Sequence, residues 1–171
     1  LYYKRNMYTV SFDGVDYQAY YGAVIPVPEN PTKEGYTFAG WCDENGKTPA
    51  DYGTMSTEKL SFTSCWNAMI CEYEVRIFEM NTSGRYPRIA TSTKYFLASY
   101  GETVTADYTV PEGFSFDSSK SVVSGVITST SLILKVYLAR NLFNVTYLVD
   151  GVELESAKVY YGSTVYDTYE G

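Results

Sequence analysis

The chain has 171 residues, a net charge of −7 and a pI near 4.6. Its length corresponds to one domain or two small ones, and a hydrophobic content of 45% is typical of a folded chain. The acidic balance argues against nucleic-acid binding, and no stretch approaches the roughly 20 apolar residues of a membrane span, so we expect no membrane insertion by this segment.

The first predicted elements form a small β module. Tyr8, Val10 and Phe12 alternate with polar residues, which predicts a strand that ends at the turn signal Asp13-Gly14. Prolines then predict an extended connector between the next two strands. The remaining elements expected in this module are a strand at 17–21, a strand at 35–41, a tight hairpin at Asn45-Gly46, one helical turn at 54–59 and a strand at 60–66.

A related module follows. Tyr73, Val75 and Ile77 alternate along its first predicted strand, and a polar loop is expected at 81–85. Further strands are predicted at 95–100 and 132–138. Nineteen tyrosines, together with many Thr, Ser and Val residues, agree with a mainly β fold, while α+β is possible.

The chain also repeats itself. Leu1–Phe12 returns as Val136–Tyr147, an offset of 136 − 1 = 135 residues, and Tyr20-Tyr21-Gly22 returns as Tyr160-Tyr161-Gly162, an offset of 160 − 20 = 140. Recurrence at fixed spacing is typical of repeat architectures. It predicts four segments: the last strand of a preceding repeat at 1–6, a first module at 7–68, a second at 69–141 and the truncated start of a third at 142–171.

The chain has three cysteines and no histidine. Without histidine a Ser-His-Asp triad cannot form, and no C-x-x-C spacing predicts a zinc or redox site. Cys42 and Cys65 lie beside Trp41 and Trp66 on predicted strands, so a cross-strand disulfide and buried free thiols are both open.

The first module resembles a known family through Tyr8–Asp13, Tyr21-Gly22, the block Pro31–Trp41 and the closing Trp66. This pattern resembles the Listeria-Bacteroides repeat family, the internalin-type B repeats. The second module resembles repeats that alternate with this family in surface proteins of Gram-positive bacteria. The resemblance implies small β-grasp-like modules in tandem, exported to the cell surface, and it offers no catalytic residues to transfer.

Four residues are predicted to be structural. We expect Trp41 and Trp66 to pack in the core, and Gly35 and Gly40 to stand where a side chain would clash with a neighbouring strand or ring. We expect no catalytic, cofactor-binding or metal-binding residues. Asp43–Gly46 lacks the ligand spacing of a calcium loop, and Glu153 and Glu155 are interpreted as a solvated strand edge rather than a glycosidase pair.

These features predict a non-catalytic stalk or spacer of a bacterial surface protein that contributes to adhesion. The expected partners are neighbouring repeats of the same chain, and the segment is expected to be monomeric. The alternative is a module that binds a host protein or glycan through exposed tyrosines.

Overall fold

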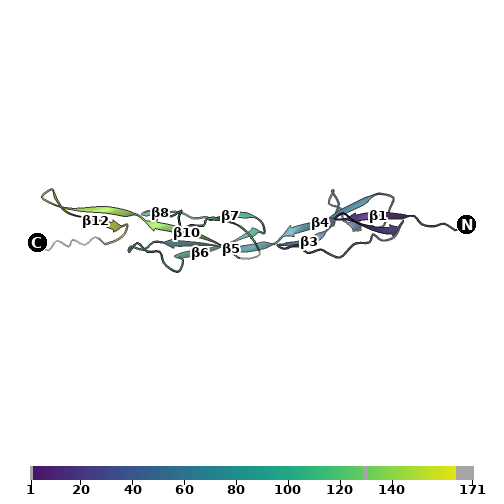
Figure 1. Cartoon of the computed structure of the whole chain (residues 1–171), viewed down its shortest axis with the longest axis horizontal. Coiled ribbons are helices and arrows are strands. Elements are labelled where there is room, and N and C mark those ends of the chain that lie inside the picture. Colours follow the sequence, from purple (N-terminus) through teal and green to yellow (C-terminus); the bar gives the residue numbers. More distant parts are fainter. Residues whose placement is uncertain (1, 129–130, 165–171) are drawn as a thin grey trace. The chain divides into compact units, whose positions relative to one another are not determined.

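Strands dominate the structure, a computed structural model that describes residues 2–128 and 131–164 (Figure 1). The mainly β fold class is therefore confirmed. The chain divides into two compact units, Leu1–Met69 and Ile70–Gly171. The parts of the segment predictions that fall on residue 1 and on 165–171 lie outside the described residues.

The first unit contains a mixed four-stranded sheet in the order β2-β1-β4-β3. Its strands are β1 (Met7–Phe12), β2 (Val15–Tyr20), β3 (Tyr36–Cys42) and β4 (Leu60–Ala68). The central pair β1 and β4 is parallel, with Val10 opposite Leu60 and Phe12 opposite Phe62, whereas β2 and β3 add antiparallel on the outside. The alternation at residues 8–12 therefore forms the strand that it predicted.

Phe12 lies at the centre of the core of the first unit. Its ring centroid is 5.1 Å from that of Trp41, 5.2 Å from that of Phe62 and 5.7 Å from that of Tyr17. The other buried members of the core are Val10, Ile25, Met55 and Leu60. Because β1 turns every second side chain to the same face, Val10 and Phe12 both point into this cluster.

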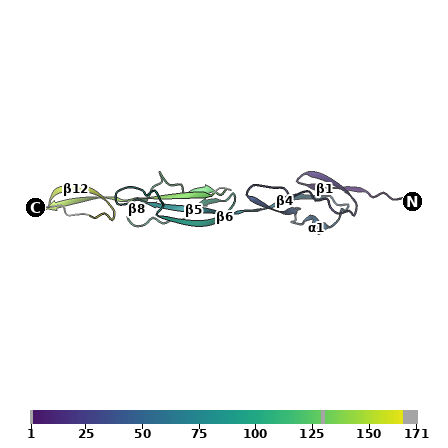
Figure 2. The same ribbon diagram turned by 90° about the horizontal axis from the view of Figure 1, so that it is seen from below.

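The connection between β3 and β4 differs from the prediction. The tight turn forms at Asn45-Gly46, because the Gly46 N–H donates to the Asp43 carbonyl at 3.0 Å and the Asp43 N–H donates to the Lys47 carbonyl at 2.8 Å, but a helix rather than a strand follows it, so no hairpin is completed. The helical turn lies at α1 (Pro49–Tyr52), not at 54–59, and Figure 2 labels it in the first unit.

The position of α1 follows from local signals. Asp51 accepts from the backbone N–H and the hydroxyl of Thr48, Pro49 occupies the first turn, and Gly53 ends the helix at φ +72°. Thr-Pro-x-Asp is a variant of the capping box, and this signal could have located the helix from the sequence.

The second unit contains a sheet with the same arrangement, in the order β6-β5-β10-β8. Its strands are β5 (Ile70–Glu79), β6 (Ser92–Ser99), β8 (Phe114–Phe116) and β10 (Leu132–Arg140), and the short strands β7 (Thr103–Thr105) and β9 (Ser124–Val126) pair with each other (Figure 1). Here too the central pair, β5 and β10, is parallel. Val75, Leu134, Val136 and Leu138 are fully buried in the core of this unit.

The third predicted repeat begins as a hairpin of β11 (Leu142–Val149) and β12 (Val152–Tyr160). Leu142 faces Tyr160 just as Met7 faces Tyr20 in the first unit. Both hairpins turn at an Asp-Gly pair with positive φ at both residues, as two-residue type I′ turns require. This hairpin lies in the same compact unit as the second module.

Residues 2–6 form no strand, contrary to the prediction for 1–6. The corresponding segment at the end of β10 is paired with β5 on one side and with β8 on the other. In the first unit no counterpart of β5 or β8 lies beside residues 2–6, so their backbone groups lack the partners that would hold them in a sheet.

Candidate functional site: the module junction and the disulfide hairpin

The junction between β10 and β11 is organised around Arg140. Its Nε donates to the Met80 carbonyl at 2.9 Å and its Nη1 donates to the Tyr161 carbonyl at 2.8 Å. The guanidinium carbon lies 4.6 Å from the ring centroid of Phe114. The Arg140 side chain therefore links the end of β5, the Phe114 ring on β8 and the end of the β11–β12 hairpin.

Asn141 adds a second set of bonds. Its backbone N–H donates to the Gly113 carbonyl at 2.8 Å, and its carbonyl accepts from the Tyr161 N–H at 2.8 Å. The Ser115 hydroxyl donates to Asn141 Oδ1. The residue thus joins the second module to the hairpin through main-chain bonds that any substitution except proline would keep.

Two glycines accommodate the tyrosine rings of the hairpin. A Cβ added at Gly84 would collide with the Tyr160 ring, and one added at Gly113 would collide with the Tyr161 ring. Both glycines also have positive φ, +73° and +81°. The sequence predicted a module boundary between residues 141 and 142 but gave no role to these glycines, because nothing local to a polar loop tells which ring will contact it.

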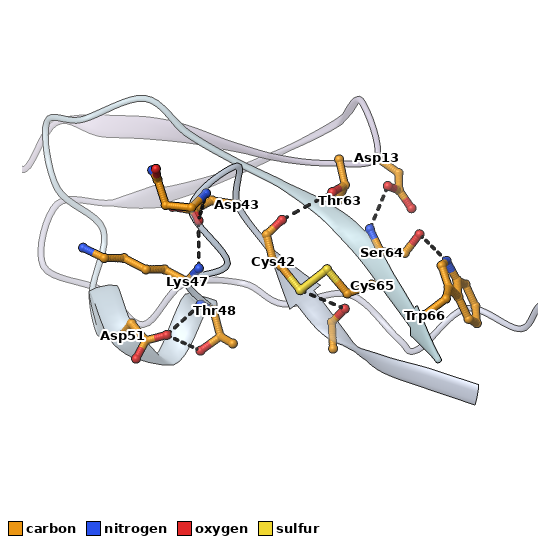
Figure 3. The surroundings of a disulfide bond; sticks show 12 residues. Asp13, Cys42, Asp43, Lys47, Thr48, Asp51, Thr63, Ser64, Cys65 and Trp66 are labelled. Carbon is orange, nitrogen blue, oxygen red and sulfur yellow. Dashed lines mark hydrogen bonds between the residues drawn. A yellow bond between two sulfur atoms is a disulfide. The ribbon is translucent and has the colours of Figure 1, made fainter. Parts of the chain in front are cut away.

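The second feature is a disulfide in the hairpin of β3 and β4. Cys42 and Cys65 are bonded, with their Cα atoms 6.1 Å apart, on strands that run antiparallel (Figure 3). Cys71, the third cysteine, lies in the second unit against its core. Of the two alternatives left open by the sequence, the structure contains the cross-strand disulfide.

The two tryptophans differ in their surroundings. Trp41 is 7% exposed and belongs to the core. Trp66 is only half-buried, stacks edge-on against Phe38 with centroids 5.5 Å apart, and donates its indole N–H to Ser64 at 3.0 Å (Figure 3). The prediction of core packing is therefore wrong for Trp66. The reason is that β1 ends opposite Phe62, so the part of β4 beyond it lacks the central neighbour that would bury it.

The role predicted for Gly40 is also wrong. A Cβ there would meet no heavy atom within 4 Å, but φ is +130° and the register of β3 against β4 shifts between Phe38 and Gly40. Glycine is needed because the backbone bulges, not because space is short. Gly35 likewise has a positive φ of +76°.

A hydrogen-bonded loop precedes α1. The Asp43 carboxylate accepts from the Tyr52 hydroxyl and from the N–H groups of Asn45 and Lys47 at 2.9 and 2.8 Å. The Tyr52 hydrogen bond is the main cause that lowers the pKa of Asp43, and the same bond raises the pKa of Tyr52 to about 12. This loop explains Asp43–Gly46 as a turn closed by its own side chain.

Replacement Tyr52→Phe is expected to flatten the pH dependence of the first unit's melting temperature. A lowered Asp43 pKa contributes stability above its usual value of 3.8 that is lost as the pH falls below it. A raised Tyr52 pKa contributes stability below 10.0 that is lost as the pH rises toward about 12. The phenylalanine keeps the ring contact with Phe62, so the variant should fold.

Melting curves between pH 2.5 and 12 measure this effect. Tyr86→Phe is the matched control, because Tyr86 donates to Asp117 in the second unit at 2.9 Å and should leave the profile of the first unit unchanged. Identical profiles for Tyr52→Phe and the unmodified chain would show that the Tyr52–Asp43 hydrogen bond contributes nothing to the pH dependence of stability.

The remaining predicted features lie at the surface. Glu153 and Glu155 are exposed on β12, as expected of a strand edge. Within residues 2–128 and 131–164, no group of three or more acidic or cysteine side chains could hold a metal ion. The same residues contain no helix long and apolar enough to cross a membrane.

Residues 8–63 match the Listeria-Bacteroides repeat domain. The resemblance of the first module to this family, predicted from the block Pro31–Trp41, is thereby confirmed. A family of this kind indicates a structural module.

Two relatives come from Evansella cellulosilytica. One, provisionally named a membrane protein, is 33% identical over 108 residues, which cover 58% of this chain and 15% of the relative. The other, provisionally named a glycine-rich membrane protein, is 25% identical over 193 aligned residues, covering 94% of this chain and 20% of the relative. The chain thus spans about a fifth or less of the length of these relatives.

Proposed function

We propose that this chain is a segment of a bacterial cell-surface protein in which small β modules serve as a semi-rigid spacer that contributes to adhesion. The Listeria-Bacteroides repeat at 8–63, the internal repeat and the membrane-protein names of the two relatives support this placement at the surface. The function would be mechanical, because each module adds length and each junction restricts bending.

The observation that carries the proposal is the Arg140 junction. A flexible linker between modules would be rich in Gly and Ser and would make few contacts. Here the two linking residues, Arg140 and Asn141, donate or accept five hydrogen bonds with both sides of the junction. Such a connection holds the hairpin in one orientation on the second module.

The alternative, recognition of a host protein or glycan by exposed tyrosines, is less well supported. Tyr160 and Tyr161, which repeat Tyr20 and Tyr21, lie where a side chain on Gly84 or Gly113 would meet their rings. Rings that contact protein in one copy of a repeat are better explained as junction residues than as a sugar platform. Among the described residues the most exposed tyrosines are Tyr2, Tyr3 and Tyr95, at 105%, 89% and 62%, and glycan binding would have to rest on these.

Arg140→Ala is expected to broaden the distribution of distances between the hairpin and the second module. The variant loses the bonds to Met80 and Tyr161 while the bonds of the Asn141 backbone remain. Spin labels on Thr93→Cys and Ser156→Cys, both at exposed positions, would report this distance by pulsed electron resonance in a Cys71→Ser background.

The matched control is Arg88→Ala, which removes an exposed arginine of the same unit away from the junction. We expect a narrow distribution for the unmodified chain and for this control. A broad distribution already present in the unmodified chain would contradict a semi-rigid spacer.

A further inference from the structure

The first unit contains a second copy of the hairpin side of the Arg140 junction. Asn6 corresponds to Asn141, and its carbonyl accepts from the Tyr21 N–H at 2.9 Å, as the Asn141 carbonyl does from Tyr161 at 2.8 Å. The Ala23 N–H bonds to the Tyr20 carbonyl at 2.9 Å, as Ser163 does to Tyr160. The two hairpins therefore present their paired tyrosines on the same backbone geometry.

The copies differ in what covers them. Tyr20 and Tyr21 are 47% and 53% exposed, whereas Tyr160 is half-buried and Tyr161 is 37% exposed. Arg5 and Asn6 are exposed, whereas Arg140 and Asn141 are half-buried. A pocket of about 310 Å³ lies on the uncovered face, lined by Arg5, Asn6, Tyr8, Tyr21 and Thr57.

We propose that this face, formed by Arg5, Asn6, Tyr20 and Tyr21, is a docking surface for another module of the second type, that is, one like residues 69–141. The docking part of that module would be its exit, the end at which its last strand leaves the module. Tyr20 would pack on the counterpart of Gly84 and Tyr21 on the counterpart of Gly113. Arg5 would bond the counterpart of the Met80 carbonyl and the Tyr21 carbonyl, and would lie over the counterpart of Phe114. The inference rests on the proposed function, since it takes the Arg140 junction as a working connection.

The geometry selects the second type of module over the first. In the second module the Met80 N–H bonds to the Leu138 carbonyl, two residues before Arg140, so the turn after β5 lies at the exit. In the first unit the equivalent bond joins Asp13 to Phe62, and β4 continues to Ala68. The turn after β1 therefore lies too far from the exit of a first-type module to provide a carbonyl for Arg5.

The test is a chain in which a copy of residues 70–140 replaces residues 1–5, so that the copied arginine directly precedes Asn6. Nitration of Tyr20 and Tyr21 by tetranitromethane, measured by mass spectrometry of peptides, should fall several-fold relative to the unmodified chain. It should approach the nitration of Tyr160 and Tyr161 in the same molecule.

Two further chains sharpen the result. In the first, the copied arginine is changed to alanine, and protection should be partly lost. In the second, a copy of residues 7–68 precedes Asn6 instead, and Tyr20 and Tyr21 should stay as reactive as in the unmodified chain. Equal protection by both module types would overturn the inference that a second-type module is required.

Hydrogen exchange on the same molecules shows whether the copied module folds. Because peptides of the copy and of the original second module have the same mass, an unfolded copy would appear as a second, fast-exchanging population of these peptides. The docking surface would be overturned if Tyr20 and Tyr21 were nitrated as before while the copied module is folded. It would also be overturned if the copied module failed to fold in this position while the original second module stays folded. A narrow distribution of spin-label distances at the Arg140 junction, together with unchanged nitration of Tyr20, would overturn this inference but not the proposed spacer function.

Discussion

Trp41→Ala is expected to lower the free energy of unfolding of the first unit by about 3–5 kcal/mol, as for other buried aromatic residues. The indole is 7% exposed and contacts Phe12 and Phe38 with centroids 5.1 and 5.5 Å apart. A module of this size has a thin core, so the loss is a large share of its stability. Hydrogen exchange measured on individual peptides would give the free energy of unfolding of the first unit separately from that of the second.

Trp66→Ala is the matched control for that substitution. It removes the same side chain from the same sheet, but from a half-buried position whose ring contact is with Phe38. A loss of about 1–2 kcal/mol is expected. Equal losses for the two variants would show that the core extends to Trp66, contrary to the burial of the two rings.

The double substitution Cys42→Ala/Cys65→Ala is expected to lower the stability of the first unit by about 3 kcal/mol, because the cross-link closes a loop and restricts the unfolded chain. The bonded residues are separated by 23 positions. The same exchange experiment, performed with and without a reductant, measures the effect. The unmodified chain should become reductant-sensitive, and the variant should not.

Cys71→Ala provides the control, since it changes the second unit and should leave the reductant response of the first unit intact. Titration of the unmodified, denatured chain should find one thiol. Three thiols would contradict the disulfide directly.

Much of the strand content could be predicted because it depends on local pattern. The alternation at Tyr8, Val10 and Phe12 requires only that one face of a strand be apolar, and β1 forms there. Asp13-Gly14 and Asp150-Gly151 likewise predict turns by themselves, since few residue pairs adopt positive φ. The helix was missed although its signal, Thr48 with Pro49 and Asp51, is equally local.

The roles of single residues were harder to predict. Trp66 and Trp41 both lie among apolar neighbours in the sequence, yet only Trp41 belongs to the core, where its ring contacts Phe12 of β1. Gly40 and Gly113 are both glycines with positive φ, but only Gly113 faces a ring. The burial and contacts of a side chain depend on which strands become neighbours, and no short stretch of the sequence determines that.

By itself, the sequence determined the repeat, the family resemblance of the first module and the strands whose apolar residues alternate, because each of these depends on residues close together or on recurrence at fixed spacing. Only the tertiary structure decided that Cys42 pairs with Cys65, and that Arg140 joins Met80, Phe114 and Tyr161. These groups lie far apart along the chain, and the parallel pairing of β5 with β10 places the end of each strand beside the other. The junction is therefore a product of topology, built at the place where the sequence shows only the pair Arg-Asn.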